Sequence, residues 1–103
     1  MKPYIERFGY LITIRRPVKV IDEIRGEVVE EGVEERIEKA ILEYVSTTHR
    51  LAIEGKIPAG SLIGHTIFAV QEGDEIVVND KTYRVTSVVY RGGFYEFTAE
   101  ESK

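Results

Sequence analysis

The sequence predicts a single domain of mainly β structure. Its 103 residues match the usual length of one domain, and 43% of them are hydrophobic, so the chain can bury a core without a disulfide or a metal. Short runs of β-branched and aromatic residues recur along it, and two of them flank Asn79-Asp80, a pair typical of a tight hairpin turn. No internal repeat or linker divides the chain, so residues 1–103 are expected to form one domain.

The first predicted strand covers residues 10–15, which are rich in β-branched and aromatic side chains. Pro17 interrupts this run. Because proline donates no backbone hydrogen bond, the strand either ends there or lies at the edge of a sheet. Residues 18–24 are its candidate continuation, and residues 27–31 are expected to return after a turn at residues 25–26.

Residues 33–45 fit two structures. Apolar residues recur from Val33 to Val45 at helical spacing, with charged residues between them, which favours an amphipathic helix. The same segment ends in Ile-Leu-Glu-Tyr-Val, a sequence typical of a strand. The residues alone therefore leave the choice between helix and strand open.

Residues 46–64 are expected to form an extended loop. Ser46 is a candidate cap for a single helical turn that ends near Ile53. Three glycines and a proline then follow within ten residues. Long loops are uncommon in compact domains and are usually functional or disordered. We therefore predict that this segment is an interaction loop.

The C-terminal third predicts a meander of antiparallel strands. Residues 66–70 are expected to form a strand that leads into it. Residues 75–78 and 81–90 are expected to pair across the Asn79-Asp80 turn. Gly92-Gly93 supplies two residues that accept positive φ, and residues 94–99 return as a further strand.

Motifs for catalysis or metal binding are missing from the sequence. Cysteine is absent, which excludes disulfides and cysteine-ligated zinc. His49 and His65 are far apart, and neither stands at ligand spacing from an acidic residue. The hydroxyl residues before His49 lack a nucleophile elbow, and Lys56 after Gly55 lacks the Ser or Thr of a phosphate loop. We therefore expect no enzymatic activity, no cofactor and no metal.

The charges are unevenly distributed along the chain. The net charge of −4 argues against a nucleic-acid partner. Residues 2–25 hold six basic against three acidic residues, whereas residues 27–43 hold seven acidic against two basic residues. These stretches are either two solvated faces or a basic surface that meets an acidic surface on the next copy. The candidate residues of these faces are Arg15, Arg16, Lys19, Glu30, Glu31, Glu34 and Glu35.

The composition also indicates the setting of the protein. Glutamate is abundant, Gln71 and Asn79 are the only amides, and Met1 is the only methionine, which is typical of a thermophile. No apolar run approaches the roughly 18–20 residues needed to cross a bilayer, and the first residues lack the apolar core of a signal peptide. A soluble protein that is not secreted is expected.

The order of these segments resembles that of the small head–tail adaptor proteins, the head-closure or neck proteins of tailed phages and proviruses. The resemblance covers residues 10–100, and it depends on the ordered combination rather than on one specific motif. The segments that carry it are Ile-Thr-Ile-Arg-Arg at 12–16, residues 37–46, Leu-Ala-Ile-Glu-Gly at 51–55, Gly-Asp-Glu-Ile at 73–76, residues 79–85 and Phe-Tyr-Glu-Phe at 94–97.

This resemblance implies a small antiparallel β-barrel of about six strands, with one short helical turn and a long glycine-rich loop. It implies a strand over residues 36–45. It also implies a structural protein, in the virion or the host cytoplasm, whose copies form a head-to-tail ring under the portal and join the capsid to tail proteins, with no membrane and no specific nucleic acid as partner. The loop residues expected at the interface, unless they pack back over the barrel, are Leu51, Ile53, Lys56, Ile57, Pro58, Leu62 and Ile63.

Two other classes of protein stay open. A PUA-like small β-barrel would bind RNA or single-stranded nucleic acid by stacking bases on aromatic rings and contacting phosphates with arginines. An accessory domain of a host enzyme would rely on its partner for catalytic residues. The residues that would serve the first of these are Tyr83, Tyr90, Tyr95, Arg84 and Arg91.

Overall fold

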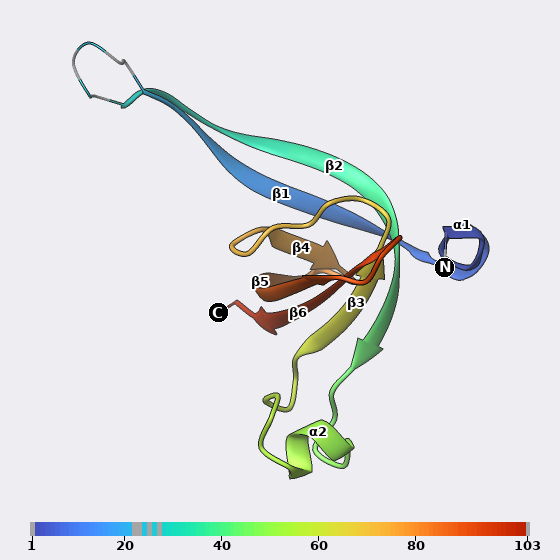
Figure 1. The fold of residues 1–103 in the computed structure, drawn as a ribbon. Coiled ribbons are helices and arrows are strands. Elements are labelled where there is room, and N and C mark those ends of the chain that lie inside the picture. The colour runs from blue at the N-terminus through green and yellow to red at the C-terminus, as the bar shows by residue number, and fades with distance from the viewer. Residues whose placement is uncertain (1, 22–23, 25, 27, 103) are drawn as a thin grey trace.

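The computed structural model describes residues 2–21, 24, 26 and 28–102. Within this part of the chain, six strands close into one antiparallel barrel in the order β1-β2-β3-β6-β5-β4 (Figure 1), so the predicted mainly β fold and the six-stranded barrel are confirmed. In chain order the elements are α1 (Lys2–Phe8), β1 (Tyr10–Ile21), β2 (Val28–Tyr44), α2 (Arg50–Ile53), β3 (Leu62–Thr66), β4 (Glu75–Val78), β5 (Lys81–Tyr90) and β6 (Tyr95–Glu101).

The predicted hairpin at Asn79-Asp80 is confirmed. β4 and β5 pair up to Val78 and Lys81, which leaves only two residues in the turn. Asn79 has φ 50° and Asp80 has φ 63°. A two-residue turn with positive φ at both positions twists in the same sense as the strands it joins, and asparagine and aspartate tolerate that conformation.

Residues 33–44 lie in a strand, against their helical spacing. The strand that the resemblance implied over residues 36–45 is thus confirmed as far as Tyr44. β2 pairs with β1 from Ile21↔Val28 to Tyr10↔Ala40. β1 pairs with β4 only over residues 13–15, so Pro17 lies where no described strand flanks its other side, which confirms its predicted edge position. The predicted turn at residue 25 and the start of the return strand at residue 27 lie outside the described residues.

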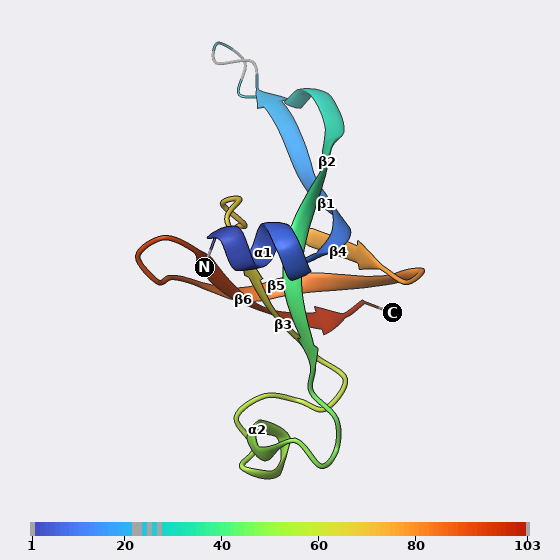
Figure 2. The same ribbon diagram turned by 90° about the vertical axis from the view of Figure 1, so that its right-hand side faces the viewer.

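A helix that the sequence analysis did not predict precedes the barrel. α1 lies outside the barrel wall beside β2 (Figure 2) and buries Ile5, which is 2% exposed. The Lys39 ammonium donates a hydrogen bond of 2.7 Å to the Glu6 carbonyl, near the end of the helix. Pro3 in the first turn is a signal that favours a helix start, so α1 was detectable in the sequence.

The second helix, α2, is the single turn predicted in the loop, but the predicted cap is wrong. Its N-cap is His49, whose Nδ1 accepts a hydrogen bond of 3.1 Å from the Leu51 backbone N–H. The Ser46 hydroxyl instead lies 3.1 Å from the hydroxyl of Thr48. A ring nitrogen therefore satisfies the free N–H at this helix start, in the place of the usual serine oxygen.

The strand predicted at residues 66–70 is wrong: β3 begins four residues earlier and ends at Thr66. The Thr66 hydroxyl donates a hydrogen bond of 2.6 Å to the Phe68 carbonyl, in the bend that follows the strand. Leu62 and Ile63 are thus barrel residues, buried at 0% and 7% exposure. Their predicted role as loop contacts with a neighbouring copy is wrong, because they pair with β2 and β6.

The core fills the barrel with side chains from every strand. Buried side chains point inward at alternate positions along the strands, as the period of a β-strand requires. The residues of this core are Ile12, Ile14, Ala40, Leu62, Val70, Ile76, Val78, Tyr83, Val85, Phe97 and Ala99.

Tyr83 is expected to make the stability of the core depend on pH. Burial raises the pKa of Tyr83 to about 12, and the Tyr44 hydroxyl adds to this effect. In the unfolded chain the phenol loses its proton near pH 10.0, the ordinary pKa, so above that pH deprotonation favours unfolding. We expect the free energy of unfolding to fall by about 2–3 kcal/mol as the pH rises from about 10 to about 12.

Urea denaturation below pH 10 and near pH 12 checks this prediction. The Tyr83→Phe variant should be less stable at neutral pH but should lose most of the alkaline decrease. An equal decrease in both proteins would contradict the assignment to Tyr83.

Candidate oligomer interface

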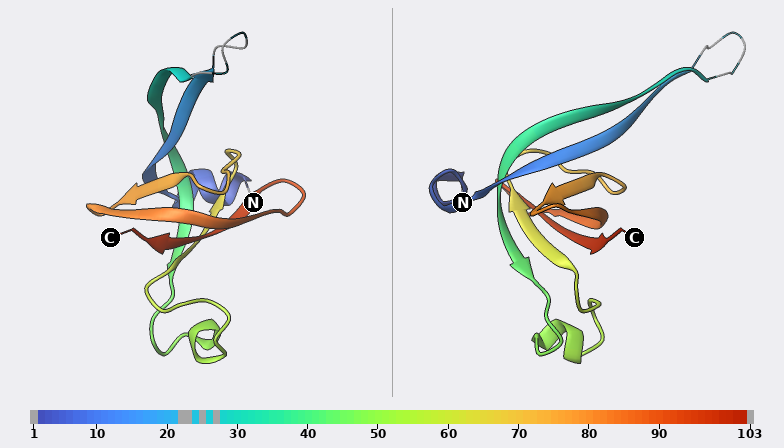
Figure 3. Two further views of the ribbon diagram at one scale, coloured as in Figure 1. Left: turned by 90° about the vertical axis from the view of Figure 1, so that its left-hand side faces the viewer. Right: turned by 180° about the vertical axis from the view of Figure 1, so that it is seen from behind.

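The long hairpin of β1 and β2 extends beyond the barrel as an arm, which we define as residues 16–21 and 28–34. Its strands pair with each other in register from Arg16↔Glu34 outward. Neither arm segment pairs with another strand among the described residues. The arm and the loop of residues 45–61, which carries α2, project at opposite ends of the molecule (Figures 1 and 3).

A charged clamp fixes the base of the arm to the barrel. Arg16 donates two hydrogen bonds to the Asp74 carboxylate, of 3.0 Å from Nε and 2.9 Å from Nη2. The Asp74 side chain is 2% exposed and also accepts a bond of 2.9 Å from the Gln71 backbone N–H. The hydrogen bond with Asp74 raises the pKa of Arg16, which stays charged. Arg36 stacks 4.1 Å from the centre of the Phe68 ring beside it.

Much of the basic stretch and most of the acidic stretch lie in β1 and β2, the two strands of one hairpin. The Arg15 Nε lies 2.9 Å from the Glu35 carboxylate, and the register places Arg16 opposite Glu34 and Lys19 opposite Glu31, with Glu30 opposite Val20. Arg15 and Glu35, which the sequence analysis assigned to different charged stretches, therefore form an ion pair within one chain.

An apolar stripe on β1 and β2, which the sequence analysis did not single out, faces solvent. Leu11 is 67% exposed, Ile37 70% and Val33 61%. Leu11 is next to the buried Ile12 on β1. Ile37 and Val33 stand opposite Thr13 and Pro17, two and six residues after Leu11, so all three side chains lie on the outer face of the sheet. Val33 and Ile37 are four residues apart, a spacing that fits the apolar face of a helix. The sequence therefore did not indicate that both side chains point away from the core.

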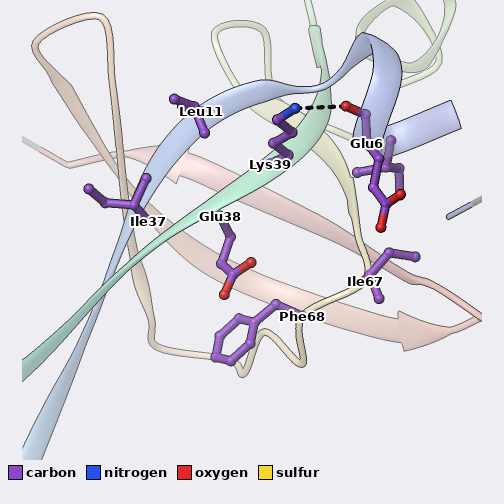
Figure 4. Close-up of a pocket in the computed structure, with 8 residues that line it drawn as sticks. Glu6, Leu11, Ile37, Glu38, Lys39, Ile67 and Phe68 are labelled. Carbon is purple, nitrogen blue, oxygen red and sulfur yellow. Dashed lines mark hydrogen bonds between the residues drawn. The ribbon is translucent and has the colours of Figure 1, made fainter. Parts of the chain in front are cut away.

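A groove of about 370 Å³ lies beside this stripe, between α1, β2 and the segment after β3 (Figure 4). Its walls combine the apolar Ile67 and Phe68 with the Glu38 carboxylate. The Lys39 ammonium in its wall is engaged by the Glu6 carbonyl. The groove therefore combines apolar surface with two acidic residues, Glu38 from β2 and Glu6 from α1.

The loop of residues 45–61 is anchored at its two ends. The Val45 N–H donates to the Ser61 carbonyl at 2.9 Å, and the Gly60 N–H donates to the Val45 carbonyl at 2.6 Å. Val45 and Ser61 are buried. Of the predicted interface residues, Ile53 is 71% exposed, Lys56 and Pro58 are exposed, and Leu51 and Ile57 are half-buried. Ile53 is thus the large hydrophobic side chain of this loop that is exposed to solvent.

Groups for catalysis or metal binding do not converge in the described part of the chain. No cluster of three or more His, Asp or Glu side chains that could hold a metal ion is found there. His49 lies 2.8 Å from Glu43 and His65 4.0 Å from Glu96, so the two histidines have separate partners. Among the described residues, no helix has both the length and the apolar character needed to span a membrane.

The residues proposed for nucleic-acid stacking do not form one surface. Tyr83 is 1% exposed, so its predicted stacking role is wrong. Tyr90 and Tyr95 do lie together, with ring centres 4.9 Å apart. Arg91 donates a bond of 3.0 Å to Glu96. Arg84 stands in register between Glu75 on β4 and Glu100 on β6. Both arginines therefore have acidic neighbours, which weakens their attraction for phosphate.

The fold and its projections define a class: a closed, six-stranded antiparallel barrel with a hairpin arm. No family model matches the chain, and no curated protein matches it. Among solved structures, the solution structure of protein SF1141 from Shigella flexneri 2a is similar, with a TM-score of 0.66 over 89% of this chain and 90% of that chain. The two sequences are 16% identical, so this likeness shows the fold alone.

Proposed function

We propose that the protein is a structural subunit of the head–tail connector of a tailed phage or provirus. Copies form a ring under the portal, and the ring joins the capsid to the tail. The observation that carries this proposal is the pair of projections, the arm and the loop of residues 45–61, at opposite ends of a small barrel (Figure 1).

Opposite projections suit a ring that has one neighbour above it and another below it. In a ring, every copy presents its arm on one face and its loop on the other, so each face repeats a single contact around the axis. Ile53 on the loop and the stripe of Val33, Ile37 and Leu11 beside the arm supply exposed apolar area, which on soluble proteins is typical of interaction sites.

Deletion of the gene in an inducible provirus of the source organism tests the proposed function. We expect DNA-filled heads and free tails that do not join, because the connecting ring is missing. Electron microscopy of the lysate distinguishes these from complete particles. Normal tailed particles from the deletion strain would refute the proposal.

Complementation with point variants tests the role of the loop. Ile53→Glu should fold normally but fail to restore joined particles, because it places a charge in an apolar contact. Ser87→Glu adds the same charge at an exposed position on the barrel and should restore them. If both variants restored joined particles equally well, the loop would not be part of the interface.

A further inference from the structure

Each of the two edges of the arm lacks a neighbouring strand in the described structure. In the barrel, β1 gains a second neighbour only at residues 13–15 and β2 only at residues 40–44. Residues 16–21 and 28–34 therefore expose backbone N–H and C=O groups on one side each, within the described structure. Such edges are templates for adding a further strand.

Charge selects which strand can be added. Residues 16–21 hold two basic residues and no acidic one, whereas residues 28–34 hold three acidic residues and no basic one. Pairing two β1 edges or two β2 edges would place like charges opposite each other, which is destabilising. Pairing a β1 edge with a β2 edge places opposite charges across the ladder, as the register already does within one hairpin.

We propose that the free edge of β1 in one copy pairs with the free edge of β2 in the next copy, so that the arms join into one continuous antiparallel sheet. This inference rests on the proposed function, because it names the contact that builds the ring. Copies related by rotation about an axis along the arms place an outgoing β1 beside an incoming β2, and those strands are antiparallel. The contact is head-to-tail and can repeat until the ring closes.

Pro17 limits which strands can pair with the free edge of β1. Proline has no N–H, so a ladder on this side of β1 gains no hydrogen bond from Pro17 as a donor. Prolines and charged side chains on an edge are devices that prevent indiscriminate strand addition. Attraction between opposite charges must then offset the hydrogen bond that Pro17 cannot donate. The acidic residues of a second copy's β2 provide that attraction.

The absence of cysteine from the chain makes cross-linking a direct test. Pro17→Cys on β1 and Val33→Cys on β2 are prepared as separate proteins, so no cross-link can form within one copy. They are mixed and treated with a short bis-maleimide. We expect the mixed dimer, which joins one copy of each variant, to exceed each like-with-like dimer by roughly tenfold, because two opposite-charge pairs across a ladder favour it and like charges disfavour the others. Ser87→Cys mixed with Val33→Cys is the control, in which no such preference is expected.

Light scattering of the unmodified protein distinguishes a failure of the strand-pairing proposal from a failure of the connector proposal. Oligomers without the mixed cross-link, or with like-with-like cross-links in excess, would overturn the strand pairing and leave the connector proposal standing. A protein that stays monomeric at every concentration would also overturn the pairing. Particles that join normally in the gene-deletion strain would instead refute the connector function, whatever the cross-links show.

Discussion

Replacing Gly64 with alanine is expected to destabilise the barrel by about 3 kcal/mol. A methyl group on Gly64 would overlap the ring of Phe97 on the neighbouring strand β6. That ring is 1% exposed and packed within the core, so it cannot move aside without displacing its neighbours. Chemical denaturation of Gly64→Ala against the original protein measures the loss.

The matched control is Gly32→Ala in the arm. Gly32 also lies in a strand and has no atom within 4 Å of the added methyl group, so its effect on stability should be small. Adding Phe97→Leu to Gly64→Ala should recover part of the lost stability, since the two changes are coupled through one contact. Equal effects of the two glycine substitutions would contradict the packing argument.

Replacing Asp74 with alanine is expected to cost a similarly large amount, about 3 kcal/mol. The substitution removes the acceptor of two Arg16 hydrogen bonds and of the Gln71 N–H. It leaves a guanidinium that is only 27% exposed without its carboxylate. Because Arg16 stands at the base of the arm, proteolysis of the arm should also become faster in this variant.

The exposed pair of Arg15 and Glu35 supplies the control. Its side chains are 43% and 56% exposed, so Glu35→Gln should change the stability by less than about 0.5 kcal/mol. Thermal unfolding of both variants provides the comparison. A loss for Glu35→Gln as large as that for Asp74→Ala would show that burial does not set the strength of these pairs.

The elements that the sequence predicted well are those whose signals are local. Asn79-Asp80 specifies its hairpin by the positive φ that few other residues accept, and the flanking strands follow from it. The segment of residues 33–39 is different. It lies in a two-stranded hairpin and is mostly exposed, so it lacks the alternation of buried and exposed residues that reveals a strand. Its assignment as a strand came from the resemblance rather than from periodicity.

The candidate interface was predicted in part. The residues of the loop at 50–58 do lie in a projecting segment, whereas Leu62 and Ile63 looked like loop residues because Gly60 and Gly64 flank them. Gly64 instead makes room for the Phe97 ring. The pairing of basic with acidic residues within one chain depends on the register between β1 and β2. The distribution of charges along the sequence does not reveal that register.

The order of the strands sets when the molecule can fold. β1–β2, β4–β5 and β5–β6 join segments that follow one another, whereas β1–β4 and β3–β6 join segments far apart in the chain. Contacts between distant segments carry a greater loop-closure cost and form late. During synthesis, β3 cannot gain its second partner until β6 (Tyr95–Glu101) has left the ribosome. The β1–β2 hairpin therefore emerges well before the barrel that anchors it can close. During that interval its charged edges and its proline are expected to disfavour pairing with strands that lack the complementary charge.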